Sequence, residues 1–150
     1  MRANGVEIAA RVRAMPAEAF AEGSWENGWN GRQILAHVAS IEWTYPRLLD
    51  LARIGGRDEA AAAVEGFDID AYNQRQVDKR VEMSVEDLVT EFERNRAATI
   101  AAIESAPDEL CSAHIRTVGG IEGTLIEVLN YVAVVHTIDH INAIEGTPQP

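Results

Sequence analysis

The stretch TLIEVLNYVAVVHTIDHINAIEG, residues 124–146, predicts one long helix near the end of the chain. Thr124 with Glu127 three positions later has the pattern of a capping box, in which both side chains bond the free N–H groups of the first turn. Gly146 stands where a helix commonly ends, because glycine readily adopts the left-handed backbone conformation found there. The range between these two signals contains no proline and is mainly apolar.

A second helix is predicted to begin after the turn-forming segment WENGWNG. Asn30 and Gln33 form another pattern similar to a capping box. Apolar side chains then recur at steps of three and four, as expected for one face of a helix: Ile34, Val38, Ile41, Tyr45, Leu48 and Ala52. Pro46 is expected to kink this helix, and Gly55-Gly56 to end it.

Weaker signals fill the rest of the chain. Residues 4–14 predict a first helix, and Pro16 either ends it or starts a short turn. Ser84 and Asp87 predict the start of a further long helix, which Pro107 stops. Between these, DAYNQRQVDKR predicts a short polar helix, and AAAAVEGF predicts either a short helix or a loop. Residues 108–123 are expected to form a loop.

Four principal helices with short connections predict an all-α fold, a four-helix bundle that forms one domain over residues 1–150. The chain is long enough for a single core of this size. The stretch at 57–80 is long enough for a crossover, so simple up-and-down connectivity does not follow from the sequence.

The charge balance limits the possible partners. The formal net charge is −11, which excludes nucleic acid and membrane surfaces as expected partners because both attract clustered Lys and Arg. The amino terminus lacks the apolar core of a signal peptide, and Cys111 is a single cysteine that has no partner for an internal disulfide. We therefore expect a cytoplasmic protein.

Two histidines are four residues apart in the last predicted helix. His136 and His140 differ by about 40° around an ideal helix axis, so both rings can reach one point on the apolar face. His37 belongs to the apolar face of the second helix, and a bundle can bring facing helices together around one metal. Three neutral imidazoles suit Zn, Ni, Fe or Cu and leave a coordination position open. The alternative is that each ring is a buried histidine that bonds a carbonyl or carboxylate.

Two other candidate ligands are less well placed. His114 and Cys111 form a C-x-x-H pair in the expected loop, where a surface histidine is the ordinary interpretation. No sequence feature indicates that Cys111 is activated as a nucleophile.

These histidine-bearing stretches resemble a known superfamily. GWNGRQILAHVASIEW at 28–43 and VVHTIDHINAIEG at 134–146 are similar to the DinB/YfiT-like superfamily, especially the amino-terminal domain of mycothiol-dependent maleylpyruvate isomerases. The stretch from DAYNQRQ to ATIAAI, residues 70–103, is also similar. The resemblance implies a four-helix bundle that holds one divalent metal, with Zn or Ni expected, through His37, His136 and His140.

The resemblance also implies a chemistry. Relatives use a metal-activated low-molecular-weight thiol such as mycothiol, because a coordinating thiol loses its proton. The isomerases carry an additional carboxy-terminal domain, whereas this sequence ends at Pro150, so we expect a thiol S-transferase or related isomerase rather than maleylpyruvate as substrate. A metal-dependent hydrolase and a non-enzymatic bundle with a vestigial metal or small-molecule site are the alternatives.

Further residues are candidates for binding a small-molecule substrate. Thr44 lies about two turns beyond His37 on nearly the same line of the helix. Tyr72, Asn73 and Arg75 belong to the short polar helix, and Arg75 is able to bind a carboxylate. A helix that is solvated and packs only Tyr72 is an equally good interpretation. Trp25 and Trp29 are expected to anchor the turn before the second helix.

A homodimer is the expected assembly. The resemblance favours it, and Val6, Ile8 and Val12 in the first predicted helix are candidates for an apolar surface that a partner would cover.

Overall fold

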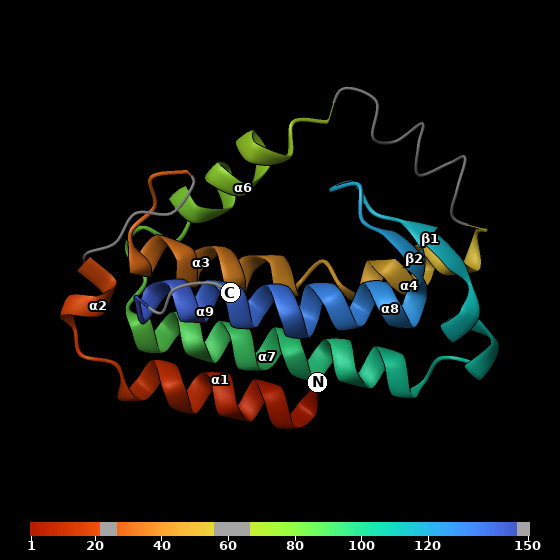
Figure 1. The fold of residues 1–150 in the computed structure, drawn as a ribbon, viewed down its shortest axis with the longest axis horizontal. Coiled ribbons are helices and arrows are strands. Elements are labelled where there is room, and N and C mark those ends of the chain that lie inside the picture. The colour runs from red at the N-terminus through yellow and green to blue at the C-terminus, as the bar shows by residue number, and fades with distance from the viewer. Residues whose placement is uncertain (22–26, 56–66, 147–150) are drawn as a thin grey trace.

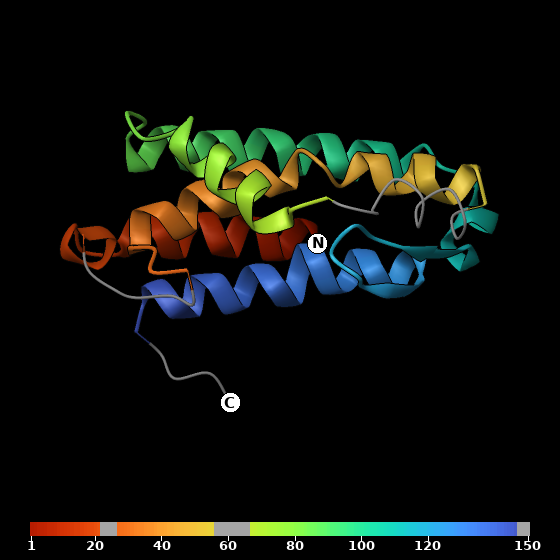
Figure 2. The same cartoon turned by 90° about the horizontal axis from the view of Figure 1, so that it is seen from above.

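The computed structural model describes residues 1–21, 27–55 and 67–146 and shows a bundle of four helical columns (Figures 1 and 2). Three columns are α1 (Arg2–Ala14), α7 (Val85–Glu104) and the pair α3 (Gly31–Glu42) and α4 (Pro46–Arg53). The fourth joins α8 (Leu125–Asn130), the π-helical segment η2 (Tyr131–Val135) and α9 (His136–Ile144) without a break. The all-α bundle predicted from the sequence is thereby confirmed.

The shorter elements lie outside these columns: α2 (Glu18–Ala21), α6 (Ile69–Asp78), the 3-10 helix η1 (Asp108–Ser112), β1 (His114–Arg116) and β2 (Glu122–Thr124). In Figure 1, α6 crosses above α3, and the two strands lie near α4 and α8 at the other end of the bundle. The polar helix predicted around residues 70–80 is α6. Trp25 and all of AAAAVEGF except Phe67 lie outside the described residues.

Side-chain caps set the starts of three helices as the sequence predicts. Asn30, Ser84 and Thr124 each accept a hydrogen bond from the backbone N–H three residues later, and the residue at that third position bonds back to the cap. These reciprocal bonds satisfy N–H groups that have no partner within the helix.

Pro46 interrupts its helix, where a kink was predicted. α3 ends at Glu42, a turn covers residues 43–45, and Pro46 becomes the first residue of α4. Proline has no N–H to donate to the preceding turn, and the first position of a helix is where that loss costs least.

The expectation of a loop over residues 108–123 is wrong. This range contains η1 and most of an antiparallel hairpin, in which Ile115 pairs with Gly123. Ile115 is buried, and its neighbours in the strand, His114 and Arg116, are exposed. Three residues of alternating burial are too short a run to stand out from a loop in the sequence.

The core also corrects the expected dimer surface. Ile8 and Val12 are each 1% exposed and belong to the core between α1, α3, α7 and α9, whereas Val6 is 70% exposed. Ile8 and Val12 therefore stabilise the single chain and are not surface residues. None of the described helices is long and apolar enough to cross a membrane.

Candidate metal centre and adjoining chamber

Three histidine rings meet between α3 and α9. One nitrogen from each of His37, His136 and His140 lies within 4.8 Å of the other two. The Nε2 atoms of His136 and His140 are 3.0 Å apart, and the ring centroids of His37 and His140 are 5.0 Å apart. His37 and His140 are buried, whereas His136 is half-buried. The structure thus brings together the three histidines that the sequence nominated.

The local backbone explains where the α9 ligands point. His136 is the first residue of α9 and follows η2, whose wider turns shift the register of the last helix. Because His136 and His140 are four residues apart in regular α-helix, their rings lie on one face.

A buried polar cluster holds the carbonyl groups of η2. Arg96 on α7 donates through Nη2 to the carbonyl of Ala133 at 2.6 Å and to the carboxylate of Glu42 at 2.7 Å. The hydroxyl of Tyr45 donates to the carbonyl of Val132 at 2.8 Å. Backbone carbonyls in a π-helical turn thus find partners on two other columns, which fixes the register of the helix that carries His136.

Sequence reasoning missed Glu42 and Arg96. Their side chains are 1% and 4% exposed and form an ion pair. A usable signal existed, since Glu42 follows Val38 and Ala39 by four and three residues on an otherwise apolar face, and buried charges require a partner. The sequence alone did not say which of the many arginines is that partner.

Trp29 packs against the ring of His37. Its ring centroid is 5.1 Å from that of His37, and its indole N–H donates to Gln74 on α6 at 2.8 Å. Trp29 is buried, in agreement with its expected role as an anchor, and it ties α6 to the bundle beside the histidines.

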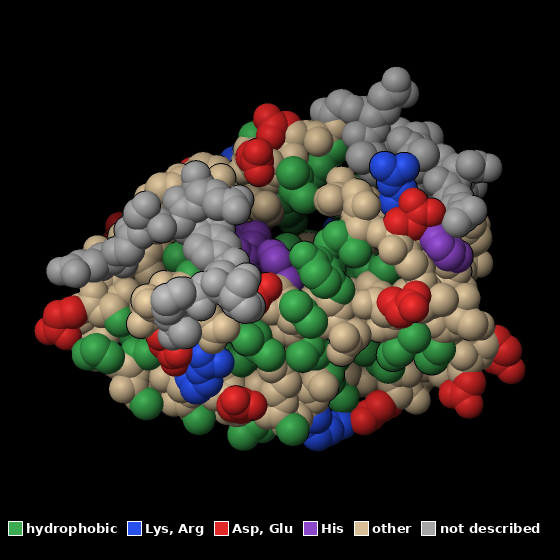
Figure 3. All heavy atoms as spheres, in the orientation of Figure 1, with side chains coloured by type: hydrophobic (Ala, Val, Ile, Leu, Met, Phe, Trp, Pro, Cys, Tyr) green, Lys and Arg blue, Asp and Glu red, His purple; other side chains and the backbone are tan. Residues whose placement is uncertain are grey.

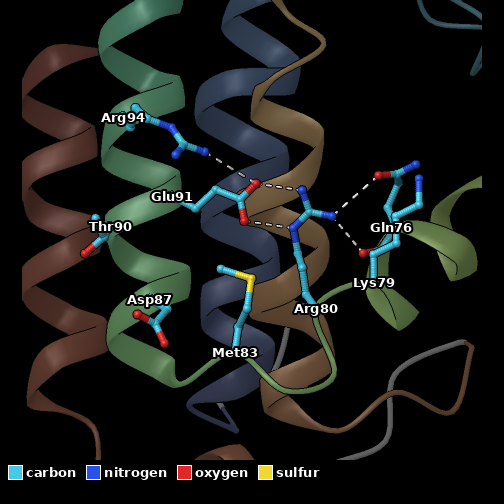
Figure 4. A pocket seen from close by; sticks show the side chains of 8 residues that line it. All are labelled: Gln76, Lys79, Arg80, Met83, Asp87, Thr90, Glu91 and Arg94. Atoms are coloured by element: carbon cyan, nitrogen blue, oxygen red, sulfur yellow. Dashed lines mark hydrogen bonds and ion pairs between the residues drawn. The ribbon is translucent and has the colours of Figure 1, made fainter.

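A second connection fixes the other end of α6. Figure 4 shows Arg80, just after α6, directed at Glu91 of α7, with a two-point ion pair of 2.6 and 2.8 Å. Arg80 also donates to the carbonyl oxygen of Gln76 at 2.8 Å, and Arg94 approaches Glu91 at 3.8 Å. These side chains line a surface pocket between α6 and α7. Because their contacts hold α6 against α7, we assign this pocket a structural role.

Burial keeps the three imidazoles neutral. Desolvation, with a smaller effect of His136, lowers the pKa of His37 from 6.5 to about 3. Desolvation, with the effects of His37 and His136, lowers the pKa of His140 to about 2. Burial also lowers the pKa of His136, although Asp139 opposes the shift. Neutral imidazole is the form that coordinates a metal.

The donor set fits a transition-metal ion. The Nδ1 atom of His37 is buried and has no hydrogen-bond partner among the described residues. The close Nε2 atoms of His136 and His140 require either one N–H donated to the other ring or two lone pairs directed at one cation. Three nitrogen ligands suit Zn or Ni better than Mg or Ca, which prefer oxygen.

A chamber of about 410 Å³ lies one helical turn from the histidines. Its wall includes Ile41, four residues after His37, and Val132, four residues before His136. Figure 3 shows a hollow surrounded by hydrophobic side chains with histidine at its edge. Of the predicted substrate residues, Thr44, Tyr72 and Asn73 line this chamber, whereas Arg75 is exposed and is not among its lining residues.

The other two nominated side chains lie elsewhere. His114 is on β1, 42% exposed, with Nδ1 3.8 Å from the carboxylate of Glu122. Cys111 belongs to η1 and is half-buried. Neither belongs to the three-histidine group.

Comparison with protein families matches residues 1–139 to one described as the mycothiol maleylpyruvate isomerase N-terminal domain. Neither the curated proteins nor the solved structures give a match to this chain. The family match covers most of the sequence and agrees with the resemblance seen in its histidine-bearing stretches. It includes α3 with His37 and the start of α9 with His136, and it ends one residue before His140. The chain belongs to the mycothiol maleylpyruvate isomerase N-terminal domain family, a metal-associated group of DinB-like domains.

Proposed function

We propose that this protein is a divalent-metal-dependent enzyme that acts with a low-molecular-weight thiol, as a thiol S-transferase or a related isomerase. The observation that carries the proposal is the convergence of His37, His136 and His140 within 4.8 Å, in a chain of this family. Zn or Ni is the metal that we propose, since imidazole is a suitable ligand for both. When bound, such an ion supplies a Lewis acid that makes a coordinating thiol acidic at neutral pH.

The residues of the chain prepare the site for this chemistry. Burial keeps His37 and His140 neutral, so no proton has to be removed from them near pH 7 before they coordinate. Trp29 packs on His37, and the contacts of Arg96 and Tyr45 with η2 hold the helix that carries the other two rings. The protein thus contributes orientation and exclusion of water.

The neighbouring chamber supplies a place for the second substrate. In S-transfer, the thiol sulfur forms a bond to an electrophilic carbon while the bond from that carbon to its leaving group breaks, and the thiol proton passes to solvent. Thr44, Tyr72 and Asn73 line a space one turn from the histidines where such an acceptor would be held. The exposed Arg75 would contact only the part of a ligand that extends outside the chamber.

The test is metal analysis of the purified protein, followed by a thiol-consumption assay with an electrophile such as chlorodinitrobenzene. We expect thiol-dependent turnover that a chelator abolishes and that added Zn or Ni restores. A protein that takes up no metal from either solution contradicts the proposal, as does turnover that a chelator leaves unchanged.

A further inference from the structure

The wall of the chamber is almost entirely apolar. It is built from four places: the end of α3 with α4, the start of α6, the β1–β2 turn, and η2. Its apolar members are Ile41, Tyr45, Leu48, Leu51, Phe67, Ile69, Tyr72, Val118, Ile121 and Val132. A cavity of this size and lining matches the sites that bind small apolar molecules.

The chamber has few polar side chains: Thr44, Arg47, Asn73 and Thr117. Of the lining residues that the structure describes, only Arg47 is charged. The Thr44 hydroxyl already donates to the carbonyl of Ile41 at 2.7 Å. The guanidinium of Arg47 lies 4.0 Å from the ring centroid of Trp43 and makes no ion pair with the described residues. Arg47 lines the chamber from α4, ten residues after His37, and it is exposed, so a charged group bound there would stay in contact with water.

We propose that the chamber binds an apolar monocarboxylate, with its carboxylate at Arg47 and its hydrocarbon portion along the wall toward Ile41 and Val132. The end opposite the carboxylate then lies one turn from His37 and His136. That this ligand is the co-substrate of the thiol rests on the function proposed above, but the binding itself does not.

The lining argues against the thiol carrier as the occupant. A sugar-based thiol such as mycothiol has many hydroxyl groups, and an apolar wall would leave them without hydrogen-bond partners. Binding of an alkyl or aryl portion instead becomes more favourable with each carbon that leaves water. A thiol carrier of this kind would therefore have to reach the histidines from outside the chamber.

Calorimetric titration of the full chain with straight-chain carboxylates from butanoate to decanoate, in the presence of a chelator, tests the assignment. We expect affinity to rise roughly threefold to fourfold per added methylene until the chamber is full. Octanol should bind more weakly than octanoate, and Arg47→Gln should weaken octanoate roughly twofold to fivefold while octanol is unchanged. An affinity that does not increase with chain length overturns the proposal.

Two matched substitutions locate the binding. Val118 in the β1–β2 turn lines the chamber and is 48% exposed, whereas Val6 on α1 is 70% exposed and is not part of the chamber wall. We expect Val118→Asp to weaken octanoate at least tenfold and Val6→Asp to leave it unchanged, with circular dichroism showing that both variants are folded. Equal effects of the two substitutions would place the ligand elsewhere.

The two proposals fail separately. Because the titrations contain neither metal nor thiol, a chain-length dependence in a protein that never binds metal would refute the enzymatic proposal and leave the chamber assignment intact. Metal-dependent thiol turnover without chain-length dependence would refute only the chamber assignment.

Discussion

Arg96 donates a 2.6 Å hydrogen bond to the carbonyl oxygen of Ala133, three residues before the first histidine of α9. The same guanidinium neutralises the buried Glu42. Replacing Arg96 by methionine would leave the Glu42 carboxyl inside the bundle without its cation, so that it either stays charged there or takes up a proton. We therefore expect Arg96→Met to lower the free energy of unfolding by about 3–5 kcal/mol, measured by urea denaturation.

A matched variant and a second substitution separate charge from packing. Arg94 lies two residues away on α7 with a side chain that is 71% exposed, so Arg94→Met should change the unfolding free energy by less than about 1 kcal/mol. Glu42→Gln combined with Arg96→Met removes the stranded charge and should recover part of the loss. If the double variant is no more stable than Arg96→Met, the ion pair does not explain the effect.

The histidine positions give a direct comparison of metal binding. We expect His37→Ala, His136→Ala and His140→Ala each to lose most bound metal, because two ligands hold a divalent ion far less tightly than three. His114→Ala should keep the metal content of the unchanged protein, since His114 lies outside the group. Elemental analysis of the four folded variants makes the measurement. Normal metal content in His37→Ala would show that α3 contributes no ligand.

Acid should destabilise the metal-free protein before its surface carboxylates titrate. The pKa of His37 is about 3 and that of His140 about 2 in the folded chain, against 6.5 when unfolded, so the unfolded state takes up protons first. Glu42 acts in the opposite direction, because burial raises its pKa to about 7 despite Arg96. The two histidines outweigh Glu42, and we expect the free energy of unfolding to fall by about 1 kcal/mol between pH 6.5 and 5.5.

Urea denaturation with a chelator present, at pH 7.5, 6.5 and 5.5, measures this dependence. In His37→Gln one of the buried imidazoles is absent, and the loss of stability on acidification should become smaller. An unfolding free energy that increases as pH falls through this window would show that Glu42, and not the histidines, dominates the proton balance.

Removal of one hydroxyl tests the contact between the α3–α4 turn and η2. Tyr45 is 2% exposed and its hydroxyl donates to the carbonyl of Val132. We expect Tyr45→Phe to lower the unfolding free energy by about 1–2 kcal/mol, because the carbonyl of Val132 loses the hydrogen bond that this hydroxyl donates. Tyr131 is 44% exposed, so Tyr131→Phe is the matched control and should be nearly neutral. Equal stability of the two variants would contradict the role assigned to Tyr45.

Local signals in the sequence predicted the parts of the fold that depend on neighbouring residues. The caps at Asn30, Ser84 and Thr124 require only residues three positions apart, and all three helices start where the sequence predicts. Two helical faces, one with His37 and one with His136 and His140, were likewise enough to nominate the three rings that the structure brings together.

Features that depend on distant residues were not predictable in this way. Glu42 and Arg96 are 54 positions apart, and their pairing follows from how α3 and α7 pack. The chamber combines residues from α3, α6 and the hairpin, so no single stretch of sequence reveals its apolar lining. The interruption at Pro46 and the π-helical turns of η2 depend on which contacts compensate for the lost regular hydrogen bonds.

The π-helical segment has a consequence for how this chain can tolerate deletions. A π-helical turn contains one residue more than an α-helical turn, so loss of one residue from 131–135 would allow a regular α-helix to run through with the face of α9 nearly unchanged. With the π-helical turn kept, loss of one residue from α8 would instead turn everything after it by about 100° relative to the start of α8. His136 and His140 would still be four residues apart, yet both would face away from His37. The direction in which the His136 and His140 rings point thus depends on the number of residues that precede them in the helix. A deletion that spares every histidine can separate the three rings as completely as replacing one of them.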